Sequence, residues 1–359
     1  MLQNLSPQPV DKIIELVQQF RDDPRADKID LGVGVYKNAA GVTPVMRAVK
    51  AAEHRLWQSQ TTKAYTAMAG DPAYLEAMKT LILNGAVDDG RIAAIATPGG
   101  TGAIRQALEL IRRATPDATI WISDPTWPNH PSIIRYLGLK MAKYRYFDEA
   151  TRDVNFAAMI DDLRAVKAGD VVLLHGCCHN PTGANLTLAQ WETVTELLDG
   201  CGALPMIDIA YQGFGDGLDA DAAALRMLVA RLPETLIAAS CSKNFGIYRE
   251  RTGILMAIGE TAASLPAIQS TLVFLNRQNY SFPPDHGARL DTMILNDAAL
   301  RADWATELED TRQTMLSLRT QLTAELRQRS NSDRFDFIAH HRGMFSRIGA
   351  SPQQVAKMR

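Results

Sequence analysis

The stretch Ser240-Cys241-Ser242-Lys243-Asn244-Phe245-Gly246 decides how this chain is interpreted. It follows an apolar run, residues 236–239, that is typical of a buried strand, so Lys243 comes just past a strand's carboxyl end. A lysine among small neighbours there can form a Schiff base with a carbonyl cofactor, and Arg251 can hold a phosphate of that cofactor. For a lysine considered alone, exposure to solvent is the better interpretation. The chemical hypothesis therefore depends on what the other strand ends supply.

Length and composition place the chain among globular proteins with a large core. Its 359 residues suffice for two domains, and 46% of them are hydrophobic. Thirty-eight basic residues balance 40 acidic ones without a run of like charge, so neither nucleic acid nor a membrane surface is expected as a partner. No signal peptide, no stretch of about 18 apolar residues and no disulfide framework is recognisable. We expect a cytoplasmic protein with reduced thiols that binds small molecules.

From residue 90 onward, short apolar runs alternate with helical patterns, which indicates successive strand–helix–strand units and an α/β fold with a mostly parallel sheet. The runs predicted to be strands are 91–97, 118–123, 171–175, 204–209, 236–240 and 253–258. The segments predicted to be helices are 11–21, 44–57, 103–113, 300–329 and one that begins at Asp71-Pro72. After residue 285 the pattern becomes mainly helical, with two short strands expected at 335–338 and 344–346. This shift in composition predicts a second, smaller domain.

Candidate binding groups follow the predicted strands. Residues 97–102, Thr-Pro-Gly-Gly-Thr-Gly, lead into a helix whose amides can cradle a phosphate, although a plain glycine-rich turn is the default interpretation. Trp127, in a proline-rich loop, can stack on a planar ring. Asp208 lies inside an apolar run, where it needs a cationic partner such as a protonated pyridine nitrogen unless it caps the next turn. Tyr211 and Asn180 can reach an oxygen of the same ring.

Residues 175–183 also contain two histidines and two adjacent cysteines, which are potential zinc ligands. Adjacent cysteines do not have the C-x2-C spacing of zinc sites, and no second cluster completes a tetrahedral site. We interpret the cysteines as structural and expect no metal. Together, the phosphate cradle, aromatic plate, asparagine, acid, tyrosine, lysine and arginine match the functional groups of pyridoxal phosphate.

Four motifs carry a further indication: Asn180-Pro181-Thr182-Gly183, Asp208-x-Ala210-Tyr211-Gln212-Gly213-Phe214, Ser240-x-Ser242-Lys243-Asn244-Phe245-Gly246 and Arg251. With them the sequence resembles the aspartate and aromatic amino acid aminotransferases, which are fold type I pyridoxal phosphate enzymes. The resemblance runs from the first helix to Arg359 and is greatest to the bacterial aromatic branch over residues 241–251 and 276–281. It implies a large cofactor-binding domain, residues 45–310, and a small α+β domain made of residues 12–44 and 311–359.

The resemblance also implies the reaction, which is transamination of aromatic amino acids and aspartate with 2-oxoglutarate by a ping-pong mechanism. Lys243 carries the internal aldimine and shuttles the proton, while Asp208 keeps the ring nitrogen protonated. Asn180 and Tyr211 bind the phenolic oxygen, and Trp127 stacks on the ring; Asn180 and Trp127 also line the substrate site. The residues implied to hold the phosphate are Gly100, Thr101, Ser240, Ser242 and Arg251.

A homodimer with shared active sites is implied as well. Tyr65 reaches the phosphate from the neighbouring subunit, and Arg277 binds the distal carboxylate of an acidic substrate or swings aside for an aromatic ring. Gly34 and its neighbours close over the substrate. The quoted residues do not rank aromatic against acidic substrates.

One departure from the family concerns the C-terminal segment. The family's arginine for the substrate α-carboxylate lies beyond Arg359, and Ser351-Pro352 begins a helix that has only about two turns left. The sequence therefore predicts a truncated chain, for which a catalytically impaired subunit is one alternative. A pyridoxal phosphate-dependent lyase or decarboxylase on the same fold is another, against which Arg277 speaks because a second carboxylate binder suits dicarboxylic substrates.

Overall fold

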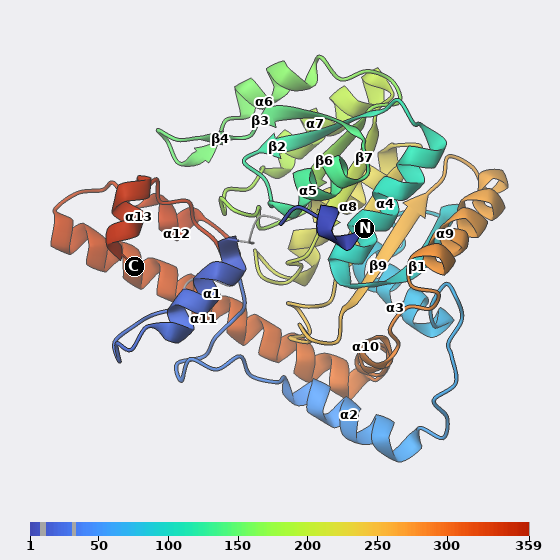
Figure 1. Ribbon diagram of the computed structural model, residues 1–359, viewed down its shortest axis with the longest axis horizontal. Coiled ribbons are helices and arrows are strands. Elements are labelled where there is room, and N and C mark those ends of the chain that lie inside the picture. The colour runs from blue at the N-terminus through green and yellow to red at the C-terminus, as the bar shows by residue number, and fades with distance from the viewer. Residues whose placement is uncertain (8–11, 31–33, 359) are drawn as a thin grey trace. The chain divides into compact units, whose positions relative to one another are not determined.

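The structure is a computed structural model that describes residues 1–7, 12–30 and 34–358 (Figure 1). It divides into two compact units, residues 1–43 and residues 44–359. The first unit contains a short 3-10 helix, η1 (Leu2–Asn4), and α1 (Lys12–Asp22). Lys28 lies against the end of α1, where its ammonium donates to the carbonyl of Phe20 at 2.7 Å, as expected for a cation at a helix C-terminus. Gly34 belongs to this unit and lies outside regular secondary structure.

A seven-stranded sheet organises the second unit, with the strand order β1-β9-β8-β7-β6-β2-β3. The strands are β1 (Ile92–Pro98), β2 (Thr119–Asp124), β3 (Lys140–Arg145), β6 (Val171–His175), β7 (Leu204–Ile209), β8 (Thr235–Ser240) and β9 (Thr252–Ile258). β9 runs antiparallel to both of its neighbours, and the other pairs are parallel. A separate two-stranded ladder joins β4 (Phe147–Asp148) and β5 (Asp153–Val154). The predicted mostly parallel sheet is confirmed.

Helices cover both faces of this sheet, so its strands are buried on both sides. Alternate residues of one strand enter two different cores: Val172 and Leu174 of β6 face one cluster, and Val171 and Leu173 face the other. One core is closed by α2 (Arg47–Ser59), α3 (Pro72–Leu83), α6 (Phe156–Leu163), α7 (Leu188–Cys201), α8 (Leu218–Arg231) and α10 (His286–Asn296). The other is closed by α4 (Gly99–Ala114), α5 (Asn129–Tyr136) and α9 (Leu265–Asn279).

Local signals place several helices as predicted. The Asp71 side chain accepts from the Ala73 amide at 2.8 Å and caps α3, with Pro72 at the first helical position. The long C-terminal helix, α11 (Ala298–Ser330), is followed by α12 (Phe337–His340) and α13 (Pro352–Met358). None of the described helices is both long and apolar enough to cross a membrane.

Two predicted strands, 335–338 and 344–346, are wrong. The first falls on a turn and α12, and the second has no regular structure. Arg319 of α11 explains why residues 344–346 form no strand. Its guanidinium donates to the carbonyls of Gly343 at 2.6 Å and Phe345 at 2.8 Å. A side chain thus satisfies backbone groups that a neighbouring strand would otherwise bind. The grouping of residues 12–44 with 311–359 in one small domain stays a prediction.

Candidate active site

The parallel strands β6, β7 and β8 have their carboxyl ends side by side, and the amino end of α4 lies next to the end of β8. Lys243 is close to Tyr211, whose ring centroid lies 4.8 Å from the lysine Nζ. Burial lowers the pKa of Lys243, Asp208 opposes that effect, and Arg251 adds to it. The net result is a lowered pKa, which increases the fraction of free, nucleophilic amine at neutral pH.

Asp208 of β7 is buried and accepts a hydrogen bond from His130 Nε2 at 3.1 Å. Burial raises the pKa of the Asp208 carboxyl. The hydrogen bond from His130 and the electrostatic attraction of His130 and Lys243 outweigh this effect, so the pKa lies below its usual value. His130 Nδ1 lies 2.8 Å from the Thr126 hydroxyl, which lies 3.2 Å from His175 Nε2. Burial lowers the pKa of His175 to about 3, so this ring stays neutral. The chain of side chains fixes an ionised carboxylate in the core.

Glycines and hydroxyl groups form a cradle around Arg251 at the start of α4. A Cβ on Gly99, whose φ is +69°, would lie 2.5 Å from Arg251 Nη2, and a Cβ on Gly100 would lie 2.9 Å from the Cβ of Ser240. Arg251 Nη1 donates to the Ser242 hydroxyl at 3.3 Å. Only glycine allows the backbone to approach these groups, and the start of a 16-residue helix with an arginine beside it suits a phosphate. Thr101 is the next residue of the same helical turn.

Three more predicted residues join this group. Burial raises the pKa of the Tyr211 phenol, and the nearby side chain of Asn180 opposes this rise. Trp127 meets His130 edge-on, with ring centroids 5.3 Å apart and planes at 88°. The asparagine, tyrosine and indole are therefore near the Lys243 and Asp208 pair, and their roles stay predictions.

Tyr65 and Arg277 belong to a different place on the second unit. Tyr65 is 84% exposed and stacks on Phe282 with centroids 4.7 Å apart, and the Arg277 guanidinium lies 6.0 Å from the same phenyl centroid. Within the described ranges, no hydrogen bond or ion pair joins either residue to Lys243. Gly34 belongs to the first unit, so its predicted closure over the substrate stays a prediction.

The cysteine cluster has a third potential metal ligand that the sequence did not reveal. Ligand atoms of Cys177, Cys178 and Asp221 lie within 4.8 Å of one another. The Asp221 carboxylate, however, accepts three backbone N–H groups of the loop 213–216 at 2.7–2.9 Å. A hydrogen bond with Cys178, together with burial, raises the pKa of Cys177, which favours the thiol over the thiolate that metals bind. Asp221 therefore holds the backbone of the loop 213–216.

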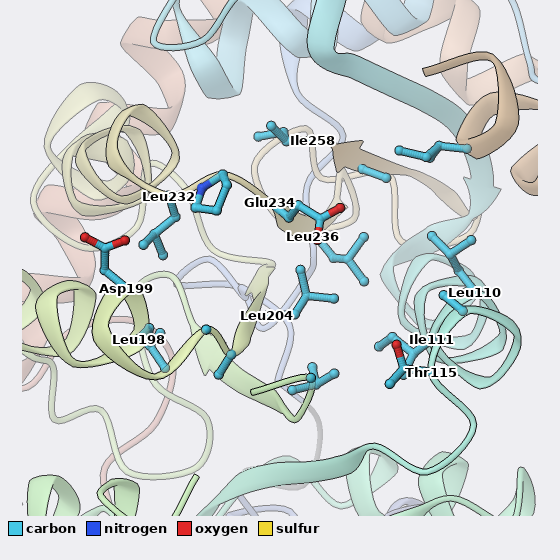
Figure 2. A pocket seen from close by; sticks show the side chains of 18 residues that line it. Leu110, Ile111, Thr115, Leu198, Asp199, Leu204, Leu232, Glu234, Leu236 and Ile258 are labelled. Carbon is cyan, nitrogen blue, oxygen red and sulfur yellow. The ribbon is translucent and has the colours of Figure 1, made fainter. Parts of the chain in front are cut away.

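A cavity of about 250 Å³ lies at the opposite, amino ends of the central strands (Figure 2). Its lining includes Val171 and Leu204, the first residues of β6 and β7, and Leu236 near the start of β8. None of the predicted site residues lines it. The reactive groups lie at the carboxyl ends of the strands, where open α/β sheets bind their ligands.

Comparison with known proteins agrees with this geometry. The sequence pattern of the family Aminotransferase class I and II matches residues 26–358. The chain belongs to this family. It is 58% identical over 359 residues to the aromatic-amino-acid aminotransferase of Paracoccus denitrificans, covering all of this chain and 91% of that protein. It is 41% identical over 362 residues to the aspartate aminotransferase of Escherichia coli K12, with the same coverage.

Solved aminotransferases have the same fold. An aromatic amino acid aminotransferase with 3-indolebutyric acid is 59% identical and superimposes with a TM-score of 0.97 over all of this chain and 91% of its own. The aromatic-amino-acid aminotransferase of Burkholderia pseudomallei, covalently bound to pyridoxal phosphate, is 36% identical with a TM-score of 0.96, over 99% and 90% of the chains. The predicted family, the type I fold and the pyridoxal phosphate cofactor are confirmed.

The residues of this aminotransferase fit the cofactor. The cradle of Gly99, Gly100 and Arg251 offers positive charge and backbone space to the phosphate, and the ionised Asp208 can face a protonated ring nitrogen. Lys243 supplies the amine. The sequence assigned no role to His130; the signal that could have identified it is the need of the buried Asp208 for a hydrogen-bond donor.

Proposed function

We propose that this pyridoxal phosphate-dependent aminotransferase moves the amino group of aromatic amino acids and aspartate to 2-oxoglutarate. The observation that carries the proposal is the half-buried Lys243, whose pKa responds to both the Asp208 carboxylate and the Arg251 guanidinium of the cradle. The names of the relatives support these substrates, because they include both aromatic and aspartate aminotransferases.

Each group has a defined task in this reaction. When bound, pyridoxal phosphate supplies an aldehyde for the amino group and a ring that accepts electrons from the substrate Cα. With the cofactor bound, Lys243 Nζ would take the proton from the substrate Cα and deliver it to the carbon that carried the cofactor's aldehyde, which its lowered pKa favours. Asp208, fixed by His130, holds the charge that keeps the ring nitrogen protonated, and Asn180 with Tyr211 orients the ring oxygen.

The proposal includes a homodimer with shared sites. Tyr65 and Arg277 lie together around Phe282, and Tyr65 is largely exposed, as expected for side chains that reach into a partner. In the partner's site Tyr65 binds the phosphate and Arg277 binds the distal carboxylate of aspartate or 2-oxoglutarate. The cytoplasmic location and the closure by Gly34 are further parts of the proposal.

Replacement of Lys243 tests the catalytic assignment. Lys243→Ala, reconstituted with pyridoxal phosphate, is expected to lose the transfer of the amino group and to retain no covalently attached cofactor after reduction with borohydride, whereas the parent chain should retain it. Covalent attachment of the reduced cofactor to the variant would refute the role of Lys243. Product analysis with aspartate separates the alternatives: oxaloacetate is expected, whereas alanine with carbon dioxide would indicate a decarboxylase.

Arg277→Leu tests the substrate assignment. A charge-assisted hydrogen bond contributes about 1.5–3 kcal/mol, so its loss is expected to raise the KM for aspartate roughly 10- to 150-fold. Phenylalanine has no distal carboxylate, and its KM should change little. Equal changes for both substrates would contradict the assignment.

A further inference from the structure

A buried cluster of amide side chains lies at the end of α9 and has no part in the chemistry described above. Gln106 of α4 and Asn276 of α9 are both 0% exposed. Gln106 Nε2 donates to Asn276 Oδ1 at 2.8 Å and to the Tyr280 hydroxyl at 3.3 Å. Asn279 Nδ2 donates to Gln106 Oε1 at 2.7 Å, and the Tyr280 hydroxyl donates to Asn276 Oδ1. These hydrogen bonds pair the side chains of the cluster with one another and join α9 to α4.

The NH2 group of the Asn276 side chain extends the cluster to two backbone segments. Its Nδ2 donates to the carbonyl of Met68 at 2.9 Å and to that of Ala96 at 3.2 Å. Met68 is three residues after Tyr65, and Ala96 lies on β1, three residues before the cradle glycine Gly99. One buried side chain thus joins the last turn of α9, which carries Arg277, to β1 and to the segment that follows Tyr65.

Stability alone does not call for amides at these positions. A buried hydrogen-bonded pair and an apolar pair of the same shape contribute similarly to folding, because the polar pair must first lose its hydration. Hydrogen bonds differ from apolar contacts in being directional. Bonds from Asn276 to three separate segments restrict rotation of the last turn of α9 about its axis, and this rotation determines where Arg277 points.

We propose that Gln106 and Asn276 are positioning residues that aim Arg277 at the distal carboxylate of aspartate in the partner's site. The inference rests on the proposed function, in which Arg277 binds that carboxylate. Phenylalanine makes no such contact, so the pair acts on one substrate class and leaves the other almost unaffected. A misplacement of about 1 Å in a binding group can cost roughly 100-fold in rate, so a partial loss of aim has a measurable effect.

The double variant Gln106→Met with Asn276→Leu replaces both amides by apolar side chains of similar shape. Each single variant should unfold at a lower temperature, because it leaves a buried amide unpaired. The double variant should recover only the part of this loss that comes from the Gln106–Asn276 bond, since the carbonyls of Met68 and Ala96 still lack the Asn276 donor. We expect the double variant to raise the KM for aspartate about ten-fold, while kcat for phenylalanine and its KM stay within about two-fold. A purely structural role predicts parallel changes for the two substrates.

Gln269→Met is the matched control. Gln269 lies on the same helix, eight residues before Arg277, and its amide bonds the backbone N–H and carbonyl of Ala94 at 2.9 and 3.1 Å. Its loss should lower the unfolding temperature and leave the KM for aspartate unchanged. Tyr280→Phe removes a single hydroxyl from the cluster, so it tests the inference with a smaller disturbance, and a smaller rise in the same KM is expected.

Two outcomes separate the inference from the function on which it rests. If Arg277→Leu raises the KM for aspartate but neither the double variant nor Tyr280→Phe does, the positioning role is refuted and the proposed function stands. If Arg277→Leu leaves that KM unchanged, the role of Arg277 fails and the inference fails with it.

Discussion

Gly99→Ala should weaken cofactor binding through Arg251. The added Cβ would lie 2.5 Å from Arg251 Nη2 and 2.9 Å from its Cζ, so the guanidinium must move by about 1 Å to restore van der Waals contact. The end of an arginine side chain moves at little cost to folding, but it then leaves the phosphate cradle. Loss of one charge-assisted hydrogen bond, about 1.5–3 kcal/mol, corresponds to a roughly 10- to 150-fold rise in the dissociation constant of pyridoxal phosphate.

Gly138→Ala is the control for backbone strain. Its φ of +70° is nearly the same as that of Gly99, +69°, and no atom lies within 4 Å of its added Cβ. Both variants should lose about 1 kcal/mol of stability from the left-handed conformation. Titration of the apoenzyme with pyridoxal phosphate, followed by fluorescence, should show weaker binding for Gly99→Ala alone. Equal dissociation constants for the two variants would refute the role given to the Arg251 contact.

Two further predictions concern titration. His130→Phe removes the donor to Asp208, so burial raises the pKa of that carboxyl; the acid limb of the kcat/KM profile should move to higher pH, and an unmoved limb would contradict the pairing. Burial raises the pKa of Asp291 well above its usual value, so the folded chain keeps a proton that the unfolded chain releases above pH about 4, and stability falls as pH rises. Asp291→Asn does not titrate, so its advantage in unfolding temperature over the parent should grow between pH 5 and 8, and a constant difference would exclude a buried neutral acid.

The sheet could be predicted because its strands are buried on both faces and appear as continuous apolar runs. The six predicted strands lie within two residues of the observed ones. β3 was not predicted, because at the edge of the sheet Lys140, Lys143 and Arg145 are exposed and interrupt the apolar pattern. The error at residues 344–346 has the opposite cause: an apolar run is held by the side chain of Arg319, and a distant side chain leaves no local signal.

The chemical types of the site residues could be predicted, because the carboxyl ends of neighbouring parallel strands lie side by side and each must supply a group that suits the cofactor. The hydrogen bonds between these residues could not be predicted. His130 and His179 follow strands and His175 ends one, and only the folded chain brings His130 to Asp208 and places His179 Nε2 3.0 Å from the hydroxyl of Ser123. Spacing along the sequence does not determine which imidazole faces a buried acid.

The arrangement explains why the pKa of Lys243 is lowered. Burial alone would favour the neutral amine of Lys243, and the Asp208 carboxylate opposes this by stabilising the ammonium form. His130 partly offsets the negative charge of Asp208 through its hydrogen bond, and Arg251 lowers the lysine pKa from the phosphate side. The titration of one amine thus depends on charges at both ends of the site. In the proposed reaction, the hydrogen bonds of His130, Thr126 and His175 would hold Asp208 in place for a protonated ring nitrogen, and the lowered pKa of Lys243 would preserve a fraction of free amine for the substrate.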